Sequence, residues 1–323
     1  MEFSFGQHDE GDFTLGLHHQ GRYDAVFDLH QCHLQSEVSN RLIDWFRQWV
    51  RDQNVPVYHM RRHEGMMRFY MIRQTTFTDQ LMINIVTNYG EISGAQAMVE
   101  AMTAAFPEIT TIVHNQNGQK SNIAVGEIET ILYGPGYMEE ELMGSRFRIR
   151  SNSFFQTNSR QAEVLYRLGF EMLKASPTDR VLDLYCGTGT IGLLLAPEVA
   201  EVVGVELVAD AVADARFNAG RNGIDNISFF EGNVKDLLQS GTPGDGFDAV
   251  IVDPPRAGIN PKALNYLIAM NAPKLLYISC NPATFARDAA RLCENGYALP
   301  EVQPVDMFPH TMHIELVGLF TRS

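Results

Sequence analysis

A cysteine and a carboxylate in the last part of the chain have the residue types and surroundings for covalent catalysis. Cys280 lies in the run Ser279–Pro282, which follows an apolar strand and precedes a helix. A thiol just before a helix N-terminus is expected to have a lowered pKa, and its thiolate is the nucleophilic form. Glu315 enters an apolar run, where burial would raise its pKa toward the range of a general base. The two residues therefore predict a nucleophile and a base.

Such a pair suits methylation at carbon 5 of a pyrimidine. That carbon is too weakly nucleophilic to attack a sulfonium methyl, and thiolate addition at carbon 6 activates it. A base must then remove the carbon-5 proton so that the thiolate can leave. His310 and His313 are alternative bases, although substrate contact and orientation suit them better. Cys186 and Cys293 are expected to pack as small apolar residues.

A glycine-rich loop predicts a cofactor that contains a nucleoside. The run after one apolar strand contains Gly187, Gly189 and Gly192. Glycines let the backbone turn tightly and let a ligand approach the main chain. Glu206 ends the next strand, where its carboxylate can accept hydrogen bonds from both ribose hydroxyls. This loop alone fits NAD as well as S-adenosylmethionine, because its glycines also spell the dinucleotide pattern.

Two further features favour S-adenosylmethionine over NAD. Asp183 completes the pattern D-x-x-x-G-x-G, which is typical of S-adenosylmethionine enzymes. The run Asp253–Arg256, Asp-Pro-Pro-Arg, resembles the loop that many base-modifying methyltransferases place beside the methyl donor. Its prolines stiffen the backbone and hold Asp253 toward the crevice at the carboxyl ends of the strands. We therefore predict S-adenosylmethionine as the cofactor.

The strands and helices expected around these residues indicate an α/β domain over residues 151–323. Short apolar strands alternate with helices there, which is typical of βαβ units around a buried parallel sheet. The expected strands are 180–185, 202–207, 227–231, 249–253, 274–279 and 314–320. The expected helices are 160–173, 191–195, 211–222 and 283–295.

Residues 1–150 predict a smaller α+β domain. Strands are expected at 1–6, 13–17, 23–29, 66–73, 81–87, 111–114, 137–142 and 146–150, and helices at 34–51 and 96–106. Two groups of arginines are either RNA contacts or the solvated faces of strands. They are Arg61, Arg62, Arg68 and Arg73, and then Arg146, Arg148 and Arg150.

Composition limits the class of protein. The 323 residues suffice for two domains of roughly 100–200 residues each. No apolar run approaches the roughly 20 residues of a membrane span, and the first residues do not form a signal peptide. The net charge of −14 argues against indiscriminate nucleic-acid binding, although local patches decide specific contacts. The cysteines are widely spaced and predict free thiols in the cytoplasm. We expect a monomer.

Taken together, the motifs resemble the uridine-C5 RNA methyltransferases of the TrmA/RumA type, which make 5-methyluridine in tRNA or 23S ribosomal RNA. They occur in the family's order at Ser153–Asn158, Asp183–Gly189, Val203–Glu206, Asp253–Arg256, Ser279–Thr284 and His310–Glu315. The resemblance implies a class I, Rossmann-like fold with a mostly parallel seven-stranded sheet. It also implies an RNA substrate whose target base flips into a crevice between the domains.

The same resemblance assigns roles to single residues. Cys280 would be the nucleophile and Glu315 the base. The methyl donor would be contacted by Gln156, Tyr185, Glu206 and Asp253, with Asn233 beside its adenine.

Two features of the family are absent from this sequence. Family members usually begin with a small β-barrel RNA-binding domain, and many hold an iron–sulfur cluster on cysteines. Cys32 matches the fourth cluster ligand, but one cysteine cannot hold a cluster. We therefore expect no cluster, no metal, a trimmed or partial homologue, and weak RNA affinity.

Other interpretations stay open at this point. An amino-group nucleic-acid methyltransferase would use the Asp-Pro-Pro loop and would not need the Cys280 thiolate. A non-catalytic RNA-binding module would retain the fold but bind no S-adenosylmethionine. The sequence does not distinguish tRNA from ribosomal RNA as the substrate.

Overall fold

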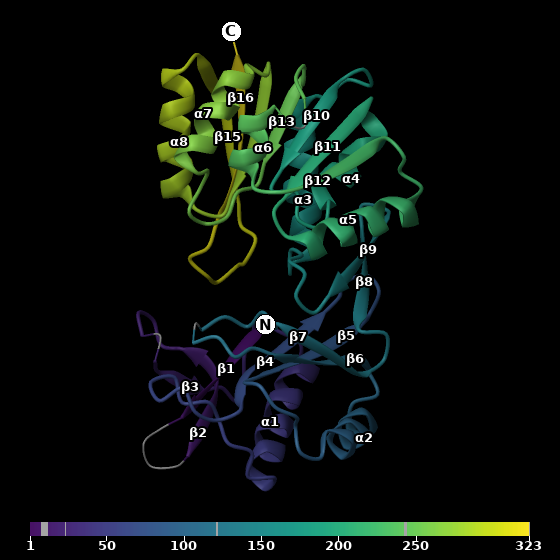
Figure 1. The fold of residues 1–323 in the computed structure, drawn as a ribbon, viewed down its shortest axis with the longest axis vertical. Coiled ribbons are helices and arrows are strands. Elements are labelled where there is room, and N and C mark those ends of the chain that lie inside the picture. Colours follow the sequence, from purple (N-terminus) through teal and green to yellow (C-terminus); the bar gives the residue numbers. More distant parts are fainter. Residues whose placement is uncertain (8–11, 23, 121, 242–243, 323) are drawn as a thin grey trace. The chain divides into compact units, whose positions relative to one another are not determined.

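The computed structural model describes residues 1–7, 12–22, 24–120, 122–241 and 244–322. The chain divides into two compact units (Figure 1). The first comprises Met1–Glu139 and Arg150–Asn152, and the second comprises Glu140–Ile149 and Ser153–Ser323. The predicted domain boundary after residue 150 stays a prediction. Within the described ranges, no helix is long and apolar enough to cross a membrane.

The first unit is a mixed sheet with two helices. Its strands are β1 (Glu2–Gln7), β2 (Phe13–His18), β3 (Val26–Asp28), β4 (Met67–Gln74), β5 (Leu81–Thr87), β6 (Ile109–Gln116) and β7 (Ile128–Tyr133). Their order is β3-β2-β1-β4-β5-β6-β7. Only β5 and β6 pair in parallel among these strands, because the helix α2 (Ala95–Ala105) connects them. The sequence did not predict β7, and Tyr23 of the expected strand at 23–29 lies outside the described residues.

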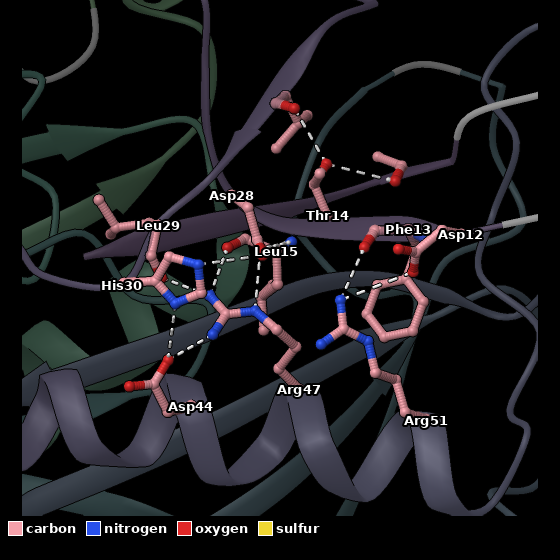
Figure 2. A network of polar contacts seen from close by, with 12 residues as sticks. Asp12, Phe13, Thr14, Leu15, Asp28, Leu29, His30, Asp44, Arg47 and Arg51 are labelled. Carbon is pink, nitrogen blue, oxygen red and sulfur yellow. Dashed lines mark hydrogen bonds and ion pairs between the residues drawn. The ribbon is translucent and has the colours of Figure 1, made fainter.

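The helix α1 (Glu37–Asp52) is anchored to this sheet by a buried arginine (Figure 2). Arg47 is 3% exposed and pairs with Asp28 at 2.9 Å and with Asp44. Its guanidinium also donates to the carbonyl oxygens of Leu15, at 3.1 Å, and Leu29. The helix begins after Ser36, whose hydroxyl accepts from a backbone N–H of the first turn, and not at 34 as predicted.

Two of the predicted RNA-contacting arginines are used inside the protein. Arg68 is 3% exposed, donates to the carbonyl oxygen of Gln119 at 2.7 Å and stacks 4.5 Å from the ring centre of Tyr58. Arg148 pairs at 2.7 Å with Asp214, which is fully buried. Both guanidinium groups therefore satisfy polar atoms of the protein itself, and Arg68, which is buried, does not lie on a solvated strand face.

The second unit contains the predicted seven-stranded, mostly parallel sheet. Its order is β12-β11-β10-β13-β14-β16-β15. The strands are β10 (Arg180–Leu184), β11 (Glu201–Glu206), β12 (Ile227–Glu231), β13 (Ala249–Val252), β14 (Lys274–Ser279), β15 (Tyr297–Val305) and β16 (Glu315–Arg322). β16 and β15 run antiparallel at one edge. A separate hairpin consists of β8 (Tyr137–Leu142) and β9 (Ser145–Arg150).

Helices cover both faces of the seven-stranded sheet in the second unit. They are α3 (Ser159–Leu173), α4 (Thr190–Leu195), η1 (Ala196–Glu198), α5 (Ala209–Asn222), α6 (Val234–Ser240), α7 (Pro261–Met270) and α8 (Pro282–Glu294). Alternate residues of each central strand enter opposite cores: Ile251 packs with α3, α4 and α5, whereas Val252 packs with α7 and α8. Burial on both faces explains why these strands are almost entirely apolar in sequence.

Candidate active site

A cavity of about 950 Å³ lies where the parallel strands of the second unit end. Its walls include residues at or just after the carboxyl ends of β10, β11, β12, β13 and β14. Ligands of doubly wound sheets bind at this edge. The lining includes all seven residues that the sequence predicted for the site: Gln156, Tyr185, Glu206, Asn233, Asp253, Cys280 and Glu315.

The glycine loop joins β10 to α4 through left-handed backbone conformations. Gly187 has φ +54° and Gly189 has φ +78°. Tyr185 adopts φ +65° without being glycine, which costs about 1–3 kcal/mol and is typical of functional loops. A side chain at Gly189 would also collide with Phe229, whose ring atoms would lie 2.9 Å from the added carbon.

Glu206 is held in place by two backbone N–H groups. Gly187 donates to Oε2 at 3.0 Å and Val208 donates to Oε1 at 2.9 Å. A carboxylate has about four acceptor positions, so both oxygens can still accept from ribose hydroxyls.

Asp183 is fully buried and forms a hydrogen bond to the segment that follows the glycine loop. Its Oδ2 accepts from the Gly192 N–H at 2.9 Å, whereas Oδ1 has no hydrogen-bond partner among the described residues. Burial raises the pKa of Asp183 to about 7. An unsatisfied buried carboxyl oxygen is costly, and a cationic ligand nearby would lower that cost.

Asp253 and Glu315 complete an acidic group in the site. Burial, followed by the charges of Glu315 and Asp183, raises the pKa of Asp253 to about 8. Glu315 is 7% exposed, and burial raises its pKa as predicted. These carboxyl groups fit the sulfonium and ammonium groups of S-adenosylmethionine, because a cation would stabilise their charged forms.

Cys280 lies between β14 and α8 and is half-buried. Its pKa is raised and not lowered, so the expectation from the helix N-terminus is wrong. Burial is the largest cause, and the carboxyl groups of Glu315 and Asp253 add to it, while Arg256 acts in the opposite direction. Desolvation and two nearby acids both favour the neutral thiol over the thiolate.

The remaining histidines and cysteines do not meet at the site. His310 and His313 are exposed and are not among the described lining residues. Cys186 is buried as expected, but Cys293 is exposed, because it lies on the outer side of α8. Cys32 is buried in the first unit, where its N–H donates to Asn40. The described part of the chain contains no group of His, Cys, Asp and Glu placed to hold a metal ion.

Several lining residues were not predicted. Among them are Lys235, Asn260, Arg287 and Phe308. Lys235 lies in the first turn of α6, and Asn260 is the N-cap residue of α7. Both helices begin with the sequence Asn-x-Lys, a local pattern that could have indicated them. Arg287 lies inside α8, and no local pattern predicts that it reaches the cavity.

Comparisons with known proteins identify methyltransferase relatives of this chain. A family model for a methyltransferase domain matches residues 175–306. An uncharacterized RNA methyltransferase of Chlorobaculum tepidum is 41% identical over 315 residues, which are 96% of this chain and 65% of that protein. Another, of Caldanaerobacter subterraneus subsp. tengcongensis, is 38% identical over 100% of this chain and 72% of its own.

This chain belongs to that RNA methyltransferase family. It is also similar to a solved structure, the Pyrococcus abyssi tRNA (uracil-54, C5)-methyltransferase in complex with S-adenosyl-L-homocysteine. The two share 30% identity with a TM-score of 0.80, over 99% of this chain and 75% of the Pyrococcus chain. These matches confirm the predicted class I methyltransferase fold and S-adenosylmethionine as the cofactor of this family member. The chain spans about two thirds of the length of its relatives.

Proposed function

We propose that this chain carries the catalytic site of an RNA (uracil-C5)-methyltransferase that makes 5-methyluridine in tRNA or 23S ribosomal RNA. The observation that carries the proposal is the placement of Cys280, Glu315 and Asp253 on one cavity. Methylation of an amino group needs no thiol, so a cysteine beside a buried carboxylate favours carbon 5.

The cofactor would lie across the strand ends. S-adenosylmethionine, when bound, supplies an electrophilic methyl group on a sulfonium. Glu206 would accept hydrogen bonds from the ribose, and Asn233 would lie beside the adenine. Asp183 and Asp253 would stabilise positive charge. Gln156 and Tyr185 would complete the contacts, since all of these except Asp183 line the cavity.

Cys280 would start the reaction as a thiolate, after its thiol proton has passed to solvent. A bound sulfonium cation would favour this loss, because a nearby positive charge opposes the raised pKa. The thiolate sulfur bonds to carbon 6 of the uracil, and the electrons of the carbon 5–carbon 6 double bond move toward the carbonyl oxygen at carbon 4. Carbon 5 would then take the methyl group that bound S-adenosylmethionine supplies, with S-adenosylhomocysteine as the leaving group. This splits one difficult displacement into two feasible steps.

Glu315 would complete the cycle. Its carboxylate takes the proton from carbon 5, the double bond re-forms, and the carbon–sulfur bond breaks to return the Cys280 thiolate. A raised pKa suits this role, because a base is most effective when its pKa lies near the working pH. The buried position also keeps the carboxylate away from competing solvent protons.

The test uses RNA that contains 5-fluorouridine. Fluorine cannot be removed as a proton, so after methyl transfer the protein should stay covalently bound to the RNA. We expect a stable adduct only when S-adenosylmethionine is present, with the link on Cys280 by peptide mapping. A link on another residue, or the absence of any adduct with a protein that methylates uridine, would refute the mechanism.

The choice of RNA needs a separate experiment. The Pyrococcus relative is named for a tRNA uracil, which supports tRNA without deciding it. Transcripts of tRNA and of 23S ribosomal RNA segments, each with its target uridines replaced by cytidine as a control, should be compared as methyl acceptors. A non-catalytic RNA-binding module would instead bind RNA but give no heat with S-adenosylmethionine in calorimetry.

A further inference from the structure

The loop from Asp253 to Asn260 enters the cavity without being part of a helix or strand. Asp253 is the first residue of this loop. Among the described residues, only one backbone–backbone hydrogen bond lies within the loop, from the Gly258 N–H to the Pro255 carbonyl oxygen at 2.7 Å. Something else must hold this loop, because an unsupported loop would not keep a carboxylate in a fixed position.

Asp288, on α8, is the centre of that support. It is 1% exposed, and its Oδ2 accepts from the Ile259 N–H at 2.9 Å and from the Tyr277 hydroxyl at 2.8 Å. Its Oδ1 accepts from the Arg287 guanidinium at 2.8 Å. All three partners are donors, so a carboxylate, which only accepts, matches them and an amide does not.

Neighbouring side chains extend the same support along the loop. Arg287 donates to the carbonyl oxygen of Ala257 at 3.1 Å. Asn281 donates at 3.0 Å, and Thr284 at 3.3 Å, to the carbonyl oxygen of Arg256. Asn281 directly follows Cys280, so these bonds tie the loop to the segment that carries the thiol.

Gly258 shows how closely the loop and α8 approach. It has φ +78°, and a side-chain carbon there would lie 2.5 Å from the guanidinium of Arg287 and 2.7 Å from Oδ2 of Asp288. Glycine is therefore the residue that permits these bonds.

We propose that Asp288 is a positioning residue which, with Tyr277 and Arg287, fixes the loop Asp253–Asn260 against the Cys280 segment. The inference rests on the proposed function, because that function requires Asp253 and Cys280 to be held in place relative to each other. Asp288 lines no part of the cavity and acts only through the loop.

The experiment compares matched variants of the full chain. Asp288→Asn places an NH2 group against a donor, Tyr277→Phe removes one hydroxyl, and Arg287→Gln removes the bonds to the loop. The control for Tyr277→Phe is Tyr297→Phe, because the Tyr297 hydroxyl makes a buried bond of the same kind, at 3.0 Å to Ala272, away from the loop. The control for Arg287→Gln is Arg291→Gln on the same helix.

Three readouts are used: thermal unfolding, calorimetric binding of S-adenosylhomocysteine, and the alkylation rate of Cys280 by iodoacetamide. We expect Asp288→Asn to weaken binding about tenfold, as loss of a hydrogen-bonded charge does. Tyr277→Phe should weaken it about threefold, and both controls should stay within about twofold. Alkylation should be several-fold faster in the loop variants, because a loosened loop shields the thiol less.

In RNA methylation, the loop variants should lower kcat and leave KM for RNA within about twofold, since the loop is proposed to position the reacting groups. If Tyr277→Phe matches Tyr297→Phe in binding and alkylation, the proposal is overturned, even where Asp288→Asn does not fold. Tyr277→Phe decides the outcome because Arg287 itself lines the cavity and could act there directly. Binding and alkylation need no RNA. A wild-type protein that methylates no RNA would therefore refute the proposed function and leave this test intact.

Discussion

Two groups of charged residues, one in each unit, differ in how well their charges are satisfied. In the first unit, buried Arg47 has two carboxylates and two carbonyl oxygens as partners (Figure 2). In the second, Asp183, Asp253 and Glu315 lie near one another, and burial raises the pKa of each. Charges that satisfy each other stabilise a fold, whereas unsatisfied ones indicate a site that awaits a ligand. The following predictions test this difference.

The largest effect is expected from Cys280→Ala. Methyl transfer to uridine should fall by about four orders of magnitude or more, because removal of a nucleophile stops the covalent route. S-adenosylhomocysteine binding and the unfolding temperature should change little, and calorimetry and thermal denaturation measure both. Cys293→Ala, at an exposed thiol outside the site, is the control. Retained activity in Cys280→Ala would favour an amino-group acceptor.

Glu315→Gln should have the next largest effect. Methyl transfer should continue while product release slows by roughly 10²–10⁴-fold, because the base is lost. The protein should then accumulate as an adduct with ordinary uridine RNA, visible as a shifted band on denaturing gels. Glu301→Gln, on the exposed part of β15, serves as the control. Normal turnover in Glu315→Gln would remove this residue as the base.

Arg47→Met should affect stability and leave the chemistry intact. Removing the buried guanidinium leaves two carbonyl oxygens without their donor and two partly exposed carboxylates without their cation, which together cost about 3 kcal/mol. Chemical denaturation should show this loss, while S-adenosylhomocysteine binding to the second unit stays unchanged. Arg41→Met on the same helix, where the ion pair to Glu108 is half-exposed, should cost less than about 1 kcal/mol. Equal losses of stability in the two variants would show that the buried arginine contributes no more than the half-exposed one.

The smallest effect is a pH dependence of cofactor binding. The folded protein holds protons on Asp183 and Asp253 up to pH values of about 7 and about 8, whereas unfolded aspartates release theirs near pH 4. Stability without ligand should therefore fall as the pH rises from about 4 to about 8. A cationic cofactor favours the charged carboxylates, so S-adenosylmethionine should bind more tightly, with proton release, as the pH rises from 6 to 8.

Calorimetry in buffers of different ionisation enthalpy measures this proton release. Asp253→Asn should reduce both the release and the slope of affinity with pH. Asp248→Asn, at the opposite end of β13 and exposed, should leave both unchanged. An unaltered slope in Asp253→Asn would show that Asp253 does not titrate on binding.

The sequence predicted the elements whose signal is local. Apolar strands such as Ala249–Val252 and amphipathic helices such as Ser159–Leu173 were found near their observed bounds. Strand β15 was missed because Pro300 and Pro304 interrupt it, and prolines are tolerated there only at a sheet edge. β7 was missed because most of its side chains are exposed and show no alternation.

The residues of the site were found for a related reason. Loops after parallel strands gather at one edge of a sheet, so motifs at Asp183, Asp253 and Cys280 were predicted to meet. Residues 150–323 by themselves therefore indicated the fold class, the cofactor and part of the cavity lining. Gln156, Tyr185 and Asn233 were assigned through the family resemblance, and other lining residues such as Arg287 were not predicted.

Only the tertiary structure decided how those side chains behave. The pKa of Cys280 is raised by its burial and by the charges of Glu315, on β16, and Asp253, in the loop after β13. Both residues are distant from Cys280 in the sequence, so no local pattern predicts how close they lie. The support of the loop by Asp288 depends equally on α8 packing beside β14. Electrostatic and hydrogen-bond energies depend on distances in space and on burial, and both are set only when the chain has folded.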